Sequence, residues 1–205
     1  MAGVIATQSE EVAYLVDDLL TAERAASGNL TIWAVPTSLE DELESVIALY
    51  PQRPPVGTTE SVMVMADGLR TRQIIRNLLT NASRYGGAEV RVEIDVEDGA
   101  GRLTVLDNGA GVIGMDEDRI FDPYYRLHTE VARPDSVGLG LAVARQLARL
   151  MAGDLVYRRR NGWTRFELTL PLASPPPSKT LPDPEAPGGE MTNLLPDNEA
   201  ATAEL

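Results

Sequence analysis

The sequence predicts an α+β fold, a two-layer sandwich in which helices cover one face of a mixed sheet and one further helix precedes the sandwich. Three observations predict this class. Helical patterns alternate with short β-prone runs, the strand-like runs outnumber the helices, and the last strands are joined by hairpin-like turns. The chain has 205 residues, 43% of them hydrophobic, which is enough for one sizeable core.

The first expected element is an amphipathic helix that begins near Ser9 and ends near Gly28. We expect its apolar stripe to face a core or another helix, and the acidic residues Asp17, Asp18 and Glu23 to form a solvated face. The stripe has the spacing of successive helical turns and consists of Val12, Leu15, Val16, Leu19 and Leu20.

A β-prone run over residues 30–35 follows and is closed by Pro36. Thr37 or Ser38 is then placed to cap a second helix, because a hydroxyl can accept a hydrogen bond from the first helical turn. We expect this helix to continue to about Leu49, with its apolar residues on one side.

The central part of the chain carries the clearest local signals. Residues 61–67 predict a strand, and residues 69–85 form the strongest helical pattern in the chain, ended by Gly86-Gly87. Two strands joined by a turn are expected over residues 89–96 and 102–107.

The rest of the folded part is expected to hold a long loop, a helix and a hairpin. Residues 109–137 show little periodicity and predict the loop, and glycines flank a helix over residues 139–151. Strands over residues 154–160 and 164–172 surround the turn Asn161-Gly162.

Composition excludes several kinds of site. The chain has 18 Lys and Arg, 31 Asp and Glu, one His and no Cys, so disulfide frameworks, Cys-ligated metals and thiol nucleophiles are ruled out. A formal net charge of -13 argues against a nucleic-acid partner, and no long apolar run predicts a transmembrane segment. Residues 174–205 are rich in Pro and acidic residues, which predicts a disordered acidic tail or, alternatively, a docking segment at Leu194 and Leu195.

Paired asparagines mark the first candidate site. Asn77 and Asn81 lie one turn apart on the expected helix 69–85, where they could ligate Mg²⁺, hydrogen-bond phosphate or remain solvated surface residues. Arg84 and Tyr85 follow, and they could supply a cation for phosphate and a ring for a base or ribose.

Two glycine-containing motifs follow further along the chain. Asp107 comes directly after a strand and precedes alternating glycines, an arrangement that suits either a simple turn or a ligand amine at the carboxylate. Gly138 and Gly140 open the expected helix 139–151, so its first N–H groups could face an anion.

Aromatic residues are concentrated in the long loop. Phe121, Tyr124 and Tyr125 lie within seven consecutive residues, 120–126. They could form a docking patch, or they could anchor the loop to the core.

Taken in order, these motifs resemble the catalytic ATP-binding domain of sensor histidine kinases, within the ATPase superfamily that includes gyrase, Hsp90 and MutL. The segments NLLTNASRYGG, LDNGAGV, RIFDPYYR and VGLGLAVARQLARLMAG are similar to the N, G1, F and G2 boxes of that family. The resemblance covers about residues 8–172. It implies a Bergerat ATP-binding fold over 29–173, and a second helix of the dimerisation and phosphoacceptor hairpin over 8–28.

The resemblance also implies roles for individual residues. Asn81 and Asn77 match metal-binding and phosphate-side positions, and Arg84 matches a phosphate contact, so these three form the implied catalytic group. Tyr85 matches the ring beside the nucleotide, and Asp107 matches the acceptor of the adenine amine. The other implied ATP-binding positions are Gly109, Gly111, Val112, Gly138, Leu139, Gly140 and Leu141.

Residues from about 111 to 137 match the ATP lid. Phe121, Tyr124 and Tyr125 lie in this lid and could dock a partner, and Ser136 stands where many members have Gly. His128 is expected to be an ordinary lid residue, because the phosphoacceptor His of the family lies on the first hairpin helix.

The implied function is that of an ATP- and Mg²⁺-dependent phosphotransfer module of a two-component sensor kinase. Such a protein-histidine kinase would deliver the γ-phosphate to a His on another chain or in a missing segment, and a response regulator would act downstream. Two alternatives remain open: a non-catalytic nucleotide-binding interaction module, and an anti-sigma-type protein-serine kinase. We expect a cytoplasmic location, with membrane association only through missing N-terminal parts or a partner.

Overall fold

A computed structural model describes residues 2–50, 53–58, 61–112, 114, 117–125 and 137–173. The helices are α1 (Ala2–Ala26), α2 (Leu39–Ile47), α3 (Gly68–Tyr85) and α4 (Gly140–Leu150), with a short 3-10 helix, η2 (Arg119–Phe121). The strands are β1 (Val35–Ser38), β2 (Val56–Thr58), β3 (Met63–Ala66), β4 (Val90–Glu97), β5 (Ala100–Asp107), β6 (Asp154–Arg160) and β7 (Trp163–Pro171). The expected tail, residues 174–205, lies outside the described residues.

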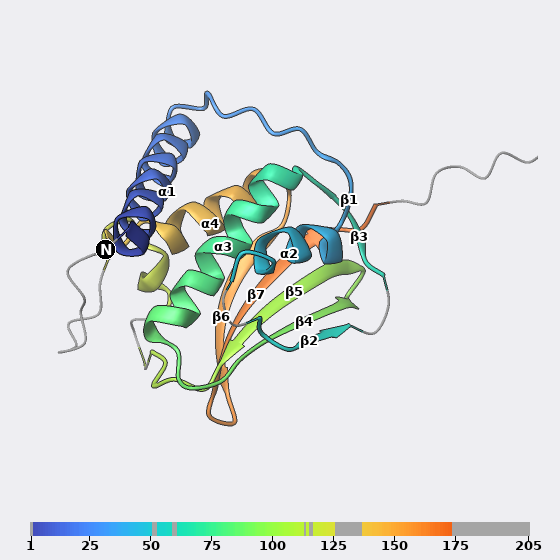
Figure 1. The fold of residues 1–205 in the computed structure, drawn as a ribbon. Coiled ribbons are helices and arrows are strands. Elements are labelled where there is room, and N and C mark those ends of the chain that lie inside the picture. Colours follow the sequence, from blue (N-terminus) through green and yellow to red (C-terminus); the bar gives the residue numbers. More distant parts are fainter. Residues whose placement is uncertain are drawn as a thin grey trace, which may run out of the picture. The chain divides into compact units, whose positions relative to one another are not determined.

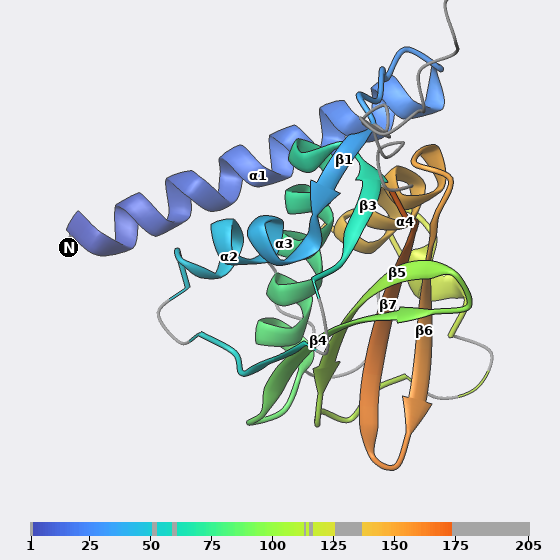
Figure 2. The ribbon, with the colours of Figure 1, turned by 90° about the vertical axis from the view of Figure 1, so that its right-hand side faces the viewer.

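The predicted fold class is confirmed. A five-stranded sheet has the order β2-β4-β5-β7-β6, and α2, α3 and α4 lie over one of its faces (Figures 1 and 2). The sheet is mixed because β2 pairs parallel to β4, whereas the other neighbours are antiparallel. A separate antiparallel ribbon of β1 and β3 touches the sheet through a bridge between Val64 and Leu172.

The two faces of the sheet have different chemistry. Alternate residues of the strands point to the helices and form a buried core with α3 and α4, as the period of two in a strand requires. Charged residues alternate with them on the other face, where Arg102 pairs with Asp95 at 2.7 Å and Arg165 pairs with Glu93 at 3.2 Å. The uncovered face is therefore neutralised by cross-strand ion pairs.

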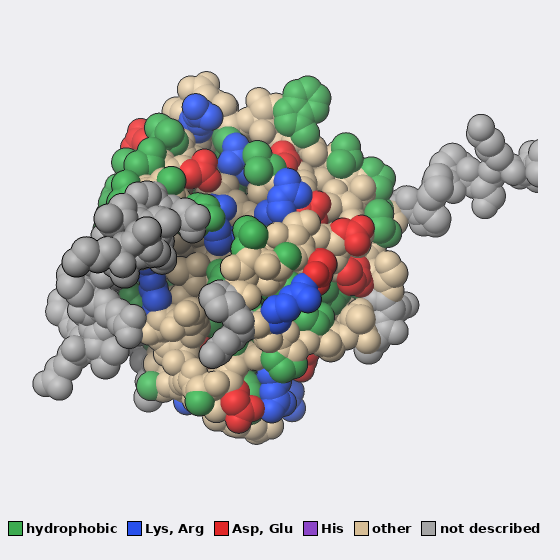
Figure 3. Space-filling model, in the orientation of Figure 1, with side chains coloured by type: hydrophobic (Ala, Val, Ile, Leu, Met, Phe, Trp, Pro, Cys, Tyr) green, Lys and Arg blue, Asp and Glu red, His purple; other side chains and the backbone are tan. Residues whose placement is uncertain are grey.

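Helix α1 corrects an expectation about its orientation. The predicted apolar stripe is largely exposed, with Val12 59% and Val16 50% accessible, and apolar side chains line the outer edge of α1 (Figure 3). The buried side instead contains Asp18, at 5% exposure, and Thr21. The expectation that Asp18 is solvated is therefore wrong, because α1 packs on polar side chains of α3. The helix also begins earlier than the expected start at Ser9.

The first strand and the end of the second helix also differ from expectation. Most of residues 30–35 lie outside strands, and β1 instead spans Val35–Ser38 and includes Pro36. Proline is tolerated there because a two-stranded ribbon consists of edge strands only. Ser38 caps α2 as predicted, accepting a hydrogen bond from the Asp41 N–H at 3.1 Å. Leu49 lies beyond the helix end and is 79% exposed.

One carboxylate links the segment after α1 to the start of α3. Asp67 caps α3, with Oδ1 accepting from the Arg70 N–H at 3.3 Å. Its other oxygen, Oδ2, accepts from the Trp33 N–H at 3.0 Å. None of the helices in the described part of the chain is long and apolar enough to cross a membrane.

Candidate functional site

The long helix α3 places the paired asparagines at the edge of the helical layer. Its apolar side chains face the sheet, and both Asn77 and Asn81 are left half-buried. The Asn77 Nδ2 donates to the Gly140 carbonyl oxygen at 3.0 Å and to Asp18 Oδ1 at 3.3 Å. The first and fourth sequence motifs thus meet through a side chain-to-backbone hydrogen bond.

The end of α3 packs directly against the turn after β5. A Cβ on Gly86 would lie 2.9 Å from the Asp107 Cβ and would overlap the Ala82 carbonyl oxygen. A Cβ on Gly109 would lie 2.7 Å from the Tyr85 carbonyl oxygen. Only glycine allows these two backbones to approach this closely, so the first and second motifs are also joined.

Asp107 is a buried carboxylate at the end of β5, with 3% of its surface exposed. Its Oδ1 accepts from the Gly109 N–H at 2.9 Å, and Thr164, its cross-strand neighbour on β7, hydrogen-bonds to it. Burial raises the pKa of Asp107, and these hydrogen bonds together with the nearby Arg159 charge offset part of that rise. The carboxylate is suited to accept a hydrogen bond from a ligand amine.

Two side chains of β6 hydrogen-bond to the glycine turn, the segment from Gly109 to Val112. The Tyr157 hydroxyl accepts from the Val112 N–H at 2.8 Å and donates to the Val112 carbonyl oxygen at 3.0 Å. Arg159 Nη1 donates to the Gly109 carbonyl oxygen at 3.2 Å. Gly111 has a φ of +66°, and a side chain there would overlap Arg159. These contacts therefore fix the backbone conformation of the turn.

The aromatic segment and the second glycine motif are also in contact. The Tyr124 N–H donates to the Gly138 carbonyl oxygen at 2.9 Å. Gly138 has a φ of +75°, and a Cβ there would lie 2.8 Å from the Tyr125 carbonyl oxygen. This contact places the aromatic segment beside the start of α4.

Of the aromatic side chains, Phe121 acts as an anchor. It is 8% exposed, meets the Phe166 ring edge-on at 6.5 Å, and lies under the Arg145 guanidinium at 4.5 Å. A ring buried in this way is not accessible for docking. Tyr124 is 62% exposed and stays available to a partner. His128 and Ser136 lie outside the described residues.

The start of α4 offers backbone donors. Leu139 is the N-cap residue, and its side chain makes no capping hydrogen bond, so within the described residues the N–H groups that begin at Gly140 and Leu141 receive no cap from it. Leu139 itself is buried at 5% exposure. Uncapped N–H groups at a helix start suit an anion. Arg84 and Tyr85 close the last turn of α3, and Tyr85 is 44% exposed.

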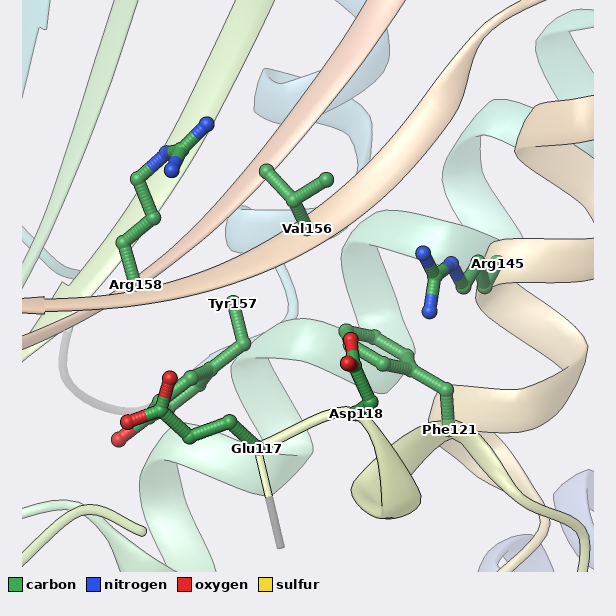
Figure 4. A pocket seen from close by; sticks show the side chains of 7 residues that line it. All are labelled: Glu117, Asp118, Phe121, Arg145, Val156, Tyr157 and Arg158. Carbon is green, nitrogen blue, oxygen red and sulfur yellow. The ribbon is translucent and has the colours of Figure 1, made fainter. Parts of the chain in front are cut away.

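A pocket of about 210 Å³ lies elsewhere, between η2, α4 and β6 (Figure 4). It is lined by Glu117, Asp118, Phe121, Arg145, Val156, Tyr157 and Arg158. Both of its cations are already paired, Arg145 with Asp154 at 3.2 Å and Arg158 with Glu167 at 3.0 Å. The asparagines, Asp107 and the α4 start do not line it, so we do not assign the site to this pocket.

The donor set of the site fits a magnesium ion that is shared with phosphates. Among the described residues, no group of three or more acidic or His side chains could hold a metal by itself. Mg²⁺ commonly takes one or two protein oxygens and completes its shell with substrate phosphates and water. The amide oxygens of Asn77 and Asn81 could supply those protein ligands.

A sheet-end carboxylate, two glycine turns, paired helical amides and an uncapped helix start, all on a helix-covered mixed sheet, define a nucleotide-binding ATPase domain. The pattern of the family described as histidine kinase-, DNA gyrase B-, and HSP90-like ATPase matches residues 66–174. The chain belongs to this family.

Comparisons with individual proteins agree. The sensor protein KdpD of Escherichia coli (strain K12) is 32% identical over 170 residues, which cover 79% of this chain and 19% of KdpD. The Acinetobacter baumannii histidine kinase AdeS has a TM-score of 0.67 at 22% identity, covering 84% of each chain, and supports the fold. Full-length ShkA in complex with AMPPNP has a TM-score of 0.66 at 25% identity, covering 82% of this chain and 37% of ShkA.

Sequence reasoning missed several residues of this region. Tyr157, Arg159 and Thr164 reach the glycine turn only because β7 pairs with β5, and β6 pairs with β7, in a particular register. The one available signal was that Thr164 shares the period-two spacing of the buried residues Phe166 and Leu168. Asp18 had none, because it lies in an acidic stretch that is typical of a solvated surface.

Proposed function

We propose that the chain is the ATP- and Mg²⁺-dependent phosphotransfer module of a two-component sensor histidine kinase. The observation that carries this proposal is the contact between all four motifs. Asn77 reaches Gly140, the end of α3 packs on the Asp107 turn, and the aromatic segment is bonded to Gly138. Motifs that are separate in the sequence are thus joined by direct contacts, which supports a shared nucleotide site.

Each part of the region has a proposed task. Asp107 accepts a hydrogen bond from the adenine amine, within the turn formed by Gly109, Gly111 and Val112. Tyr85 borders the nucleotide, and Arg84 and the N–H groups after Gly140 contact phosphates. Asn77 and Asn81 hold Mg²⁺, which neutralises phosphate charge when bound. Phosphoryl transfer depends mainly on positioning and charge stabilisation, and this set provides both.

The phosphate acceptor is proposed to be a His on another chain or on a segment outside this sequence, with a response regulator downstream. The exposed apolar stripe of α1 supports this arrangement, because a helix with Val12, Val16, Leu19 and Leu20 accessible suits packing against further helices. We therefore assign residues 8–28 to the second helix of a phosphoacceptor hairpin and residues 29–173 to the catalytic domain.

Two measurements test the proposal. Isothermal titration calorimetry should detect binding of ATP in the presence of Mg²⁺. With γ-labelled ATP, the chain should label a supplied phosphoacceptor hairpin that carries a His but should not label itself, and N81A should lose transfer. Robust self-labelling would contradict the proposed acceptor. ATP binding without transfer to any hairpin would instead favour the non-catalytic interaction module.

A further inference from the structure

The contact between α1 and α3 is polar and buried. Asp18 and Thr21 of α1 are 5% and 3% exposed, and Gln73 of α3 is 2% exposed. The apolar stripe of α1 points away from this contact. Burial of a carboxylate is unfavourable unless hydrogen bonds compensate for lost hydration, so these bonds favour the seating of α1 in which Asp18 meets α3.

Asp18 Oδ1 is the centre of that contact. It accepts from Gln73 Nε2 at 2.9 Å and from Asn77 Nδ2 at 3.3 Å. Thr21 adds its hydroxyl oxygen, which accepts from Gln73 Nε2 at 3.3 Å. Arg76 lies beside the contact, 3.7 Å from Asp17 and stacked over Tyr14. A single oxygen atom of α1 therefore holds two amides of α3.

This contact determines which way the Asn77 amide faces. Its two near neighbours, the Asp18 carboxylate and the Gly140 carbonyl, both accept hydrogen bonds. The NH₂ group must therefore point to them, which leaves Oδ1 on the other side of the amide. No donor among the described residues reaches that oxygen. An amide held in this way presents an acceptor to a ligand.

We propose that Asp18 is a positioning residue for nucleotide binding: it holds the Asn77 amide so that Oδ1 is presented to the Mg²⁺ that accompanies ATP. The inference rests on the proposed function and extends it to helix α1, outside the four motifs. Because coupling between two sites is reciprocal, binding of magnesium and ATP also strengthens the seating of α1 on α3.

The test compares two substitutions at Asp18 in the full chain. D18A removes the acceptor, and D18N keeps an oxygen that can receive both amide bonds. Residues that orient metal ligands typically change metal affinity about 10- to 100-fold when replaced. We expect D18A to weaken ATP binding about 10-fold in Mg²⁺ and to leave binding in EDTA unchanged. D18N should stay within about 3-fold of the unaltered chain in both buffers.

Two controls separate positioning from packing. E23A removes a solvent-exposed carboxylate from the same helix and should not change either affinity. In an N77A background, D18A should have no further effect on binding in Mg²⁺, because the amide that it orients is absent. Thermal unfolding of each variant verifies that it is folded.

The outcomes that would overturn the inference are distinct. Equal weakening by D18A in Mg²⁺ and in EDTA, or an equal effect of D18A with and without Asn77, would show that Asp18 only packs α1 and would overturn this inference alone. Failure of the unaltered chain to bind ATP with Mg²⁺ would overturn the proposed function as well.

Discussion

The hydroxyl of Tyr157 is predicted to hold the turn after β5, and Y157F tests this with the loss of one oxygen atom. The ring keeps its place in this variant, because the edge-on contact with Phe166 at 5.5 Å does not involve the hydroxyl. Only the two hydrogen bonds to Val112 disappear, the one that its N–H donates and the one that its carbonyl accepts. Any change therefore reports on those bonds and not on core packing.

The expected magnitude follows from burial. A hydrogen bond contributes about 0.5–1.5 kcal/mol net, so two contribute about 1–3 kcal/mol. Val112 is 8% exposed and Tyr157 is also 8% exposed, so water cannot readily replace the lost partner. We therefore expect a loss of about 2–3 kcal/mol in the free energy of unfolding. For a domain of this size, that is a decrease of about 4–12 °C in the melting temperature.

Urea titration and thermal unfolding of the nucleotide-free chain measure this loss. Y124F is the matched control, because Tyr124 is 62% exposed. Removal of this solvated hydroxyl should change the free energy of unfolding by less than about 0.5 kcal/mol. The reasoning is refuted if Y157F and Y124F unfold at the same urea concentration. In that case the bond from Arg159 to the Gly109 carbonyl would be sufficient to hold the turn.

Three further predictions concern stability. Burial raises the pKa of Asp107, so its ionised form destabilises the fold. D107N should therefore raise the urea midpoint at pH 7, and this gain should shrink as the pH falls toward the ordinary carboxyl pKa. In calorimetry, the same variant should bind ATP with an affinity about 10- to 100-fold lower. Burial alone would raise the pKa of Asp154, but hydrogen bonds from Arg149, the Leu155 N–H and Arg145 hold it below its usual value. D154N should therefore lower the melting temperature at pH 7 by the equivalent of less than about 1 kcal/mol, and this difference should vanish as the pH falls through the lowered pKa. L147A, in the core, should reduce the free energy of unfolding by about 2–5 kcal/mol in urea titration, whereas L150A, at a 44% exposed position of the same helix, should change it little.

The sequence predicted those elements whose signals lie within one short segment of the chain. The apolar face of α3 and its closing glycines are a property of one segment, and the turns at Asp98-Gly99 and Asn161-Gly162 have the positive φ angles that tight hairpins need. Strand β2 was not predicted, because three residues after a Pro-rich turn carry no periodic signal. Its pairing with β4 depends on how the whole sheet is arranged and not on a signal in its own residues.

The orientation of α1 shows the limit of the same reasoning. An apolar stripe predicts that a helix packs on something but does not say on what. Here the polar contact of Asp18 with Gln73 and Asn77 takes the side facing the domain, so the stripe stays exposed. The same limit applies to the site. Its motif residues could be predicted from the sequence, whereas Tyr157 and Arg159 could be identified only once the strand order was known.

The shared carboxylate of Asp67 has a mechanical consequence. After α1 ends, the Trp33 N–H is fastened to Asp67 Oδ2, and the same side chain caps α3 through Oδ1. Tension applied along the segment that leaves α1 is thus carried to the first turn of the helix that bears the paired asparagines. The antiparallel hydrogen bonds between β1 and β3 resist that load in shear. The part of the chain that contains α1 is therefore connected to α3 at two points. Asp18 connects it to Asn77, and Trp33 connects it to the N-terminal cap of α3.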